Sequence, residues 1–191
     1  MALKIETFSN QTGGASFFKA ISHPLAAPLA RALVAKLAKA GPVALYDPLG
    51  FAPSFAEIYP LTAVAIAGGY VQKVEALDRA VLGHRVKPVT ELAESLAKIV
   101  FIPAFDAERL VAHIRHLLPP GAAVLTLDDM RLAEPLLTNP ARYLDPLNFA
   151  TNFAFFRDAE RHHTRIVTAN YWFGYGARGM RYWARLFAAD G

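Results

Sequence analysis

The chain has 191 residues, a formal net charge of +4 and no cysteine. Hydrophobic residues make up 54% of the chain and charged residues 19%, which excludes an intrinsically disordered protein and suits one globular domain, or one domain with part of another. The absence of cysteine excludes disulfides, thiolate metal sites and a cysteine nucleophile. Because the sequence holds neither a signal-peptide core nor a run of ~18 apolar residues, we expect a soluble, cytoplasmic protein that does not enter a membrane.

The amino-terminal part divides into a lead-in and a helical region. Residues 1–14 are polar and contain a glycine pair, and we expect them to form a flexible lead-in. Apolar side chains then recur at helical spacing from Ser16 to Gly41, with an interruption at Ser22-His23-Pro24. We expect His23 to lie at a helix end, because a lone histidine beside a proline is more often structural than catalytic.

A strand is predicted at residues 42–46, and it leads into the turn Asp47-Pro48-Leu49-Gly50. A dinucleotide-binding turn at this place would hold three glycines, which let the backbone approach a pyrophosphate. This turn holds one glycine, and its proline lacks an amide donor. Simple pyrophosphate binding by the turn is therefore not expected.

The next stretch leaves two interpretations open. Residues 53–66 fit either a helix broken at Pro60 or a helix followed by a strand at 63–66. The pair Gly68-Gly69 is then typical of a turn, and it precedes a predicted strand at 70–74.

The strongest local pattern is a strand–helix–strand unit at residues 98–127. Residues 99–102 are an unbroken apolar run, the pattern of a strand buried on both faces of a parallel sheet. Asp106 is placed to cap the helix that follows. The helix and its end present one apolar stripe, made of Leu110, Val111, Ile114, Leu117 and Leu118. After a proline-proline-glycine stop, a second buried strand is predicted at 123–127, and right-handed crossover makes the two strands parallel.

Residues 43–130 resemble the Rossmann-like domain of sugar C-methyltransferases and the nucleotide-sugar-binding lobes of acyltransferases. The resemblance is carried by the order strand, turn, strand, an extended V-K-P-V-T-E-L segment before a helix, then strand, helix and strand. In that segment Thr90 can cap a helix at 91–96. The resemblance implies a Rossmann-like α/β domain, an open parallel sheet with helices on both faces, which we place at residues 15–147. It transfers no catalytic residue.

Open parallel sheets bind ligands at the carboxyl ends of their strands, near the point where the strand order reverses. Three predicted strands end close to acidic residues, which could hold ribose hydroxyls or a hard cation. The ligand-binding candidates on this rim are Asp47, Gly50, Phe105, Asp106 and Asp128. The competing interpretation, which we favour, is that each aspartate caps a helix or forms a turn.

Residues 148–191 differ in character, and we expect an aromatic β segment that begins a second domain of a longer protein. Aromatic residues crowd at 148–156, and basic residues follow as a separate block at 157–165. A platform for single-stranded nucleic acid would place both kinds on one face, so core packing is favoured over nucleic-acid binding. The pair His162-His163 is not a metal site by itself, because adjacent side chains point apart.

One literal motif, G-x-G-x-x-G, occurs at Gly174, Gly176 and Gly179, which are therefore the alternative cofactor-binding residues. Only twelve residues follow the motif, too few for the second strand and the ribose-binding acid of a dinucleotide fingerprint. Residues 180–188 fit either a helix or a strand, and we favour a β-hairpin over the fingerprint. Exposed aromatic strands invite pairing, so a homo-oligomer through the carboxy-terminal strands is expected.

The stretches YLDPLNFATNFAFFRD, HTRIVTANYW and RYWARLFAADG resemble the amino-terminal portion of a family of larger uncharacterised bacterial proteins. In that family a Rossmann-like region precedes β-sandwich modules, and the resemblance implies no established activity. The leading hypothesis is a small-molecule-binding or interaction module on a Rossmann-like scaffold. The alternative is an enzyme that depends on a nucleotide cofactor, NAD(P) or S-adenosylmethionine. The sequence identifies no catalytic residue and no metal site.

Overall fold

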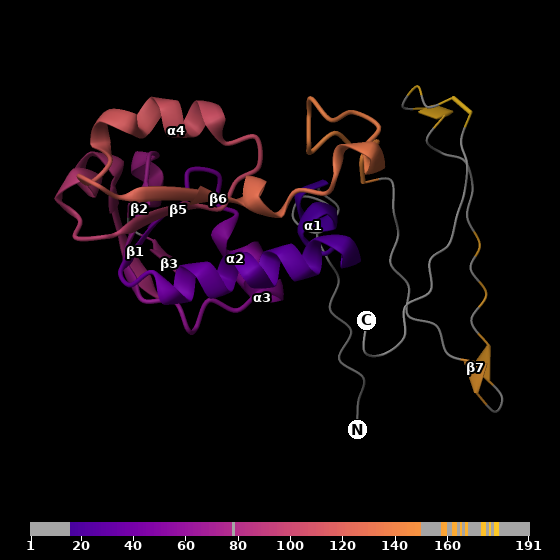
Figure 1. Cartoon of the computed structure of the whole chain (residues 1–191), viewed down its shortest axis with the longest axis horizontal. Helices are drawn as coiled ribbons and strands as arrows, with labels where there is room; N and C mark the ends of the chain where they lie inside the picture. The colour runs from indigo at the N-terminus through magenta and orange to yellow at the C-terminus, as the bar shows by residue number, and fades with distance from the viewer. Residues whose placement is uncertain are drawn as a thin grey trace.

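The computed structural model describes residues 16–77 and 79–149, together with 158–159, 162–163, 165, 167, 173–174, 176 and 178–179. The main part is built around a six-stranded sheet with the order β3-β4-β2-β1-β5-β6 (Figure 1). All neighbouring strands are parallel except β3, which runs antiparallel to β4. The protein therefore has the Rossmann-like α/β architecture that the sequence predicts.

The strands of this sheet are β1 (Val43–Tyr46), β2 (Ile66–Val71), β3 (Ala80–Val81), β4 (His84–Pro88), β5 (Ile99–Ile102) and β6 (Ala123–Thr126). The α-helices of the described residues are α1 (Ser16–Ile21), α2 (Ala27–Lys39), α3 (Ala52–Ile58) and α4 (Glu108–Ile114). Short 3-10 helices lie at η1 (Pro24–Ala26), η2 (Val74–Ala76), η3 (Val89–Glu94), η4 (Arg115–Leu117), η5 (Leu127–Met130) and η6 (Glu134–Leu136). The break that the sequence predicts in the first helical region is confirmed at η1, where His23 caps the turn by accepting from the Leu25 amide at 3.2 Å.

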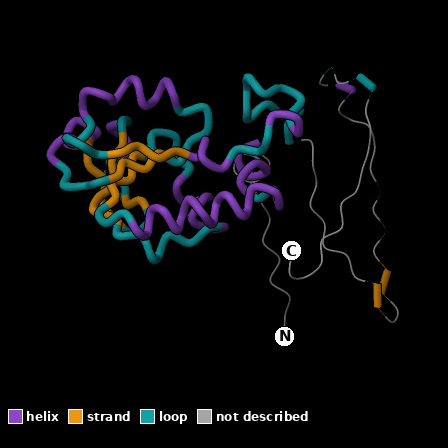
Figure 2. Tube along the Cα trace, in the orientation of Figure 1, coloured by secondary structure: helices purple, strands orange, loops and turns teal. Residues whose placement is uncertain are grey.

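The central strands are buried on both faces because every residue of β1 and β5 is apolar or aromatic. Alternate side chains enter separate hydrophobic clusters. Val43 and Leu45 pack with residues of α1, α2 and α3, whereas Ala44 and Tyr46 pack with residues of α4 on the other face. Figures 1 and 2 show the sheet edge-on between these layers, with α4 above it and α2 below.

The predicted strand–helix–strand unit is confirmed. β6 pairs with β5 in parallel, from Ile99 opposite Ala123 to Ile102 opposite Thr126. The five residues of the predicted apolar stripe all lie in the cluster on the α4 face. Because β1 pairs with β2 on one side and with β5 on the other, the strand order reverses between β1 and β5. This junction is where open α/β sheets bind ligands.

The turn predicted at Gly68-Gly69 is wrong, because β2 runs straight through both glycines. A Cβ atom on Gly69 would lie 3.1 Å from Cγ1 of Val86 on the neighbouring strand β4, which is tighter than an ordinary contact. Here the glycine allows two strands to approach and does not turn the chain. In the region before it, α3 ends at Ile58 and the chain turns at residues 62–64. A single strand from Ile66 to Val71 therefore replaces the strand considered at 63–66 and the strand predicted at 70–74.

Two predicted helix caps are also wrong. α4 begins after Ala107 without a side-chain cap, and Asp106 adopts the left-handed region at φ 51° and binds Arg131 instead. The helix that Thr90 was expected to cap at 91–96 is the 3-10 helix η3, which begins at Val89, so that Thr90 lies inside it. Pro88 precedes it, and the fixed φ of proline favours a start directly behind it.

Beyond β6 the chain returns to the carboxyl ends of the strands, and packing extends as far as the buried ring of Phe149. Farther on, β7 (Asp158–Ala159) pairs with β8 (His162–His163) in antiparallel fashion. Residues 180–188, predicted as a helix or as a strand of the favoured hairpin, and the predicted oligomer contact of the last strands lie outside the described residues. Within the described part of the chain, every helix is too short or too polar to cross a membrane.

Candidate functional site at the carboxyl ends of the strands

The loops that follow β1 and β5 lie at the point where the strand order reverses. β1 leads through residues 47–50 towards α3 on one face, and β5 leads through residues 103–107 into α4 on the other. A crevice between two such diverging loops is where Rossmann-like sheets hold nucleotides. The residues that the sequence proposes as ligands lie on these loops or just beyond β6: Asp47, Gly50, Phe105, Asp106 and Asp128.

An aromatic side chain from the amino-terminal helix fills this crevice. The ring of Phe17 on α1 stacks on the ring of Phe51, with centroids 3.9 Å apart and planes inclined by 16°. The same ring meets Phe105 edge-on, with centroids 6.1 Å apart. Phe17 is 4% exposed and Phe105 is 5% exposed. The two loops therefore close on a ring of the protein itself, at the place where a nucleotide would lie.

A buried hydrogen bond helps to hold α1 in this position. The hydroxyl of Tyr59, which follows α3, donates to the carbonyl of Ile21 at 2.7 Å. Burial raises the pKa of Tyr59, and the positive charge of Arg31 opposes this shift. The tyrosine therefore keeps its proton at neutral pH and remains a donor to the end of α1.

The packing continues as an aromatic row formed by Phe51, Phe17, Phe105, Tyr143 and Phe149. The Tyr143 ring lies 4.5 Å from Phe105 and 5.1 Å from Phe149, measured between centroids. Its hydroxyl accepts from the Leu132 amide at 3.0 Å. Burial raises the pKa of Tyr143, while the Leu132 amide and the nearby Arg131 oppose the shift. The row joins α1 to the segment that returns after β6.

Asp47 closes the turn after β1. Its carboxylate accepts from the amide of Phe51 at 2.8 Å and from the amide of Ala52 at 3.1 Å, and the residue is 4% exposed. Burial raises the pKa of this carboxyl, and hydrogen bonds from the Ala52, Phe51 and Gly50 amides oppose the shift. Both carboxylate oxygens therefore serve the first turn of α3.

Asp106 and Asp128 fix the ends of β5 and β6. The Asp128 carboxylate accepts from the amides of Asp106 and Ala107 at 2.9 and 3.0 Å, the task that the sequence analysis gave to the Asp106 side chain. The Asp106 carboxylate accepts from Arg131 at 2.7 Å and from the Tyr143 amide at 3.0 Å. Arg131 also donates to Asp128 at 3.3 Å, and its guanidinium lies 4.6 Å above the centre of the Tyr143 ring. These contacts attach the returning segment to the rim.

The glycines proposed from the sequence have space around them. Gly50 has a φ of 73°, and no atom lies within 4 Å of the position where its Cβ would be. The turn therefore needs a glycine for its backbone conformation and not for a close contact. Gly174, Gly176 and Gly179 also lie in open space. Residues 168–172 and 180–191, which would complete a fingerprint around them, lie outside the described part of the chain.

A polar chain at the end of β2 was missed by the sequence analysis. The Tyr46 hydroxyl donates to Oε1 of Gln72 at 3.2 Å, and Nε2 of Gln72 lies 3.3 Å from Nε2 of His113 on α4. Burial raises the pKa of Tyr46, so its hydroxyl stays protonated at neutral pH. Gln72 follows β2 directly, where Rossmann-like enzymes place the side chain that binds ribose. The sequence analysis placed the end of this strand at residue 74. Had it placed the end at Val71, Gln72 would have been a candidate.

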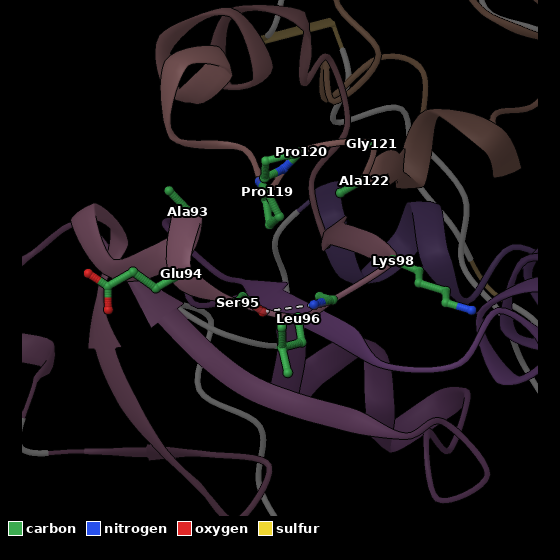
Figure 3. A pocket seen from close by; sticks show the side chains of 10 residues that line it. Ala93, Glu94, Ser95, Leu96, Lys98, Pro119, Pro120, Gly121 and Ala122 are labelled. Carbon is green, nitrogen blue, oxygen red and sulfur yellow. Dashed lines mark hydrogen bonds between the residues drawn. The ribbon is translucent and has the colours of Figure 1, made fainter.

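Two shallow cavities lie away from the rim. One of about 350 Å³ is found at the amino ends of β5 and β6, between residues 93–98 and 119–122 (Figure 3). The other, of about 370 Å³, borders β4 and is lined by Leu77, Glu91 and four residues of that strand. Neither cavity includes a candidate residue of the rim. In the described residues no group of three histidine, aspartate or glutamate side chains is placed to hold a metal ion.

The architecture and the rim define the class of this protein as Rossmann-like α/β. Comparison with known proteins found no matching family model, no matching curated protein and no matching solved structure.

Proposed function

We propose that this domain is a non-catalytic interaction module built on a Rossmann-like scaffold. The observation that carries the proposal is the position of Phe17 between Phe51 and Phe105, in the crevice that a nucleotide would need. Nucleotide binding there would require Phe17 to leave its buried site, and burial of such a ring is worth about 1.5–3 kcal/mol. Of the two parts of the leading hypothesis, these contacts favour the interaction module over the small-molecule site.

The carboxylates of the rim support the same proposal. Ribose hydroxyls or a hard cation would need free carboxylate oxygens. The oxygens of Asp47 and Asp128 already accept from backbone amides, and those of Asp106 accept from Arg131 and the Tyr143 amide. A ligand at these acids would have to share oxygens whose bonds already hold the loops together.

A second candidate is the nucleotide-cofactor enzyme, and one observation favours it. Gln72 stands at the end of β2 with Tyr46 and His113 beside it, and both Gln72 and His113 are exposed. These side chains offer donors and acceptors for a ribose. This function requires α1 to move, because the neighbouring crevice is closed by Phe17.

A thermal-shift panel separates the two functions. The ligands are NAD(P), S-adenosylmethionine, nucleotide sugars and divalent cations, tested on the wild type, on Phe17→Ala and on Phe18→Ala. Phe18 is the matched control because it lies on the same helix and is half-buried, whereas Phe17 is buried. A ligand at a hundred times its dissociation constant would stabilise the protein by about 2.7 kcal/mol, which a melting curve resolves.

The interaction module predicts no stabilisation of the wild type by any ligand. A melting temperature that rises with a nucleotide in the wild type would overturn the proposal and favour the enzyme. A rise in Phe17→Ala that is absent from Phe18→Ala would show that the crevice can hold a nucleotide once the ring is removed. That result would favour an enzyme gated by α1.

A further inference from the structure

The polar chain of Tyr46, Gln72 and His113 connects a buried side chain to the surface. Tyr46 is the last residue of β1 and is fully buried, whereas Gln72 and His113 are exposed. Tyr70, the other titratable ring of the cluster on this face, lies opposite Tyr46 on β2. α4 lies over the same face of the sheet (Figure 1). Three separate elements therefore bring the three polar groups together.

The atoms in contact determine where the protons lie. The Tyr46 hydroxyl donates to Oε1 of Gln72 at 3.2 Å, and Nε2 of Gln72 lies 3.3 Å from Nε2 of His113. An amide nitrogen can only donate, so Nε2 of His113 must accept. The neutral ring of His113 therefore carries its proton on Nδ1. Both hydrogen bonds then run in one direction, from Tyr46 through Gln72 to His113.

A protonated His113 is incompatible with this arrangement. The proton enters at Nε2, which is the atom that accepts from Gln72, so two donors would face each other. A half-turn of the Gln72 amide exchanges its oxygen and nitrogen, and this terminal torsion has two nearly equivalent positions. Oε1 then accepts from the charged ring, in a bond stronger than the neutral one, and Nε2 donates to the Tyr46 oxygen. Burial raises the pKa of Tyr46, so its hydroxyl keeps its proton in both arrangements.

We propose that this chain is a proton-operated switch, in which the charge of His113 at the surface sets the direction of the hydrogen bonds as far as the buried end of β1. Histidine changes its charge between about pH 5 and about pH 8, so both directions are reached near neutrality. On switching, the acceptor and the donor that Gln72 offers to a ligand exchange places. The inference does not rest on the function proposed above, because the switch needs no ligand.

The cations around His113 do not bond to it. Arg109 and His116 lie one helical turn away on either side, and Lys73 follows Gln72 directly. Within the described residues, Gln72 is the hydrogen-bond partner of the His113 ring. The direction of the chain therefore depends on these two side chains and on Tyr46.

The acids nearby do not hold His113 in its charged form. They are Glu75 on η2, Glu91 and Glu94 on η3, and Glu108 at the start of α4. Glu91 forms an ion pair with Lys87 at 3.6 Å. In the part of the chain that the structure describes, no carboxylate forms an ion pair with His113. His113 is therefore open to either protonation state.

The test follows the isotope-labelled full chain by nuclear magnetic resonance between about pH 5 and about pH 8. Above the titration of His113, long-range nitrogen–proton spectra are expected to show a proton on Nδ1 and none on Nε2. Below it, both nitrogens are expected to carry protons. The side-chain amide of Gln72 and the ring of Tyr46 are expected to shift with the same midpoint as His113.

Variants at exposed positions separate the switch from other effects of the charge. Gln72→Ala removes the middle of the chain, so the Tyr46 signals should no longer follow His113 although the charge remains. His113→Gln should abolish the shifts of Gln72 and Tyr46. The matched control is His116→Gln, because His116 is also exposed and has no contact with Gln72 in the described residues, and it should leave the shifts unchanged.

Three results would overturn the proposal. The first is a neutral His113 that carries its proton on Nε2. The second is a set of Gln72 and Tyr46 signals that stay fixed while His113 titrates. The third is a Tyr46 shift that persists in Gln72→Ala, which would assign the shift to the charge acting through space. Because no ligand is added, this titration and the thermal-shift panel can fail independently.

Discussion

The two halves of the rim at the carboxyl ends of the strands use their side chains in opposite ways. In the closed half, around β1, β5 and β6, the aromatic row fills the crevice, and the aspartates bond to amides or to Arg131. In the open half, at the end of β2, Gln72 and His113 are exposed, and their side chains lie within hydrogen-bond distance of each other at 3.3 Å. This difference shows that packed side chains can fill the point where the strand order of a Rossmann-like sheet reverses, while polar groups at the end of the neighbouring strand β2 remain available to a ligand.

The closed half owes its packing to two segments outside the central sheet. α1 supplies Phe17 from before the first strand, and the segment after β6 supplies Tyr143 and Phe149. Aromatic rings bury large areas and stack favourably when offset or edge-on. Both segments reach the same loops, so the crevice is closed from two sides.

The largest expected effect on this comparison comes from Tyr143→Ala, which removes a fully buried ring from the aromatic row. We expect a loss of about 3–5 kcal/mol in the free energy of unfolding, measured by urea denaturation. The control Tyr143→Phe keeps the ring and leaves only the Leu132 amide without its acceptor, at a cost of about 1–3 kcal/mol. A loss below about 1 kcal/mol for the alanine variant would mean that the returning segment does not stabilise the closed half.

The fold could be predicted from the sequence wherever the pattern was local. The strands at 99–102 and 123–126 and the helix between them follow from an apolar run, a helical stripe and a proline stop, all within thirty residues. The error at Gly68-Gly69 has the opposite origin. Glycine pairs favour turns locally, but here Gly69 packs against Val86 of a neighbouring strand, a contact that no local pattern reveals.

The location of the candidate site could be predicted from the sequence, but the hydrogen bonds and ring contacts of its residues could not. Topology alone places Asp47, Asp106 and Asp128 at the carboxyl ends of strands, because parallel strands end at one edge. The partners of Asp106 are Arg131 and the Tyr143 amide, which reach the rim only when the chain continues beyond β6. Phe17 lies 88 residues before Phe105 in the sequence, and no spacing rule connects them.

A smaller effect, with a defined dependence on pH, is expected for Asp47→Asn. The amide side chain offers one oxygen where the carboxyl offers two, so either the Phe51 or the Ala52 amide loses its acceptor, at about 1–3 kcal/mol. The folded-state pKa of Asp47 lies above its ordinary value of 3.8. The stability that the wild type gains from this raised pKa is fully present below pH 3.8 and is lost as the pH rises through the folded-state pKa.

The measurement compares wild type and Asp47→Asn by urea denaturation between about pH 3.5 and about pH 7. The stability advantage of the wild type should be largest at the acidic end and decrease towards neutrality. An advantage that grows with pH would show that the amides of the turn, and not burial, dominate the pKa of Asp47. The turn after β1 would then stabilise the charged carboxylate of Asp47 through its backbone amides.

The smallest effect is expected in the open half, from Tyr46→Phe. The variant keeps a fully buried ring and removes only the hydroxyl that donates to Gln72 at 3.2 Å. Because Gln72 is exposed and can bond to water instead, we expect a loss of about 0.5–1 kcal/mol in the free energy of unfolding. A loss above about 2 kcal/mol would place the chain of Tyr46, Gln72 and His113 among the structural contacts and remove the contrast between the halves. A small loss keeps these side chains available for a ligand, since residues that bind a partner need not stabilise the fold.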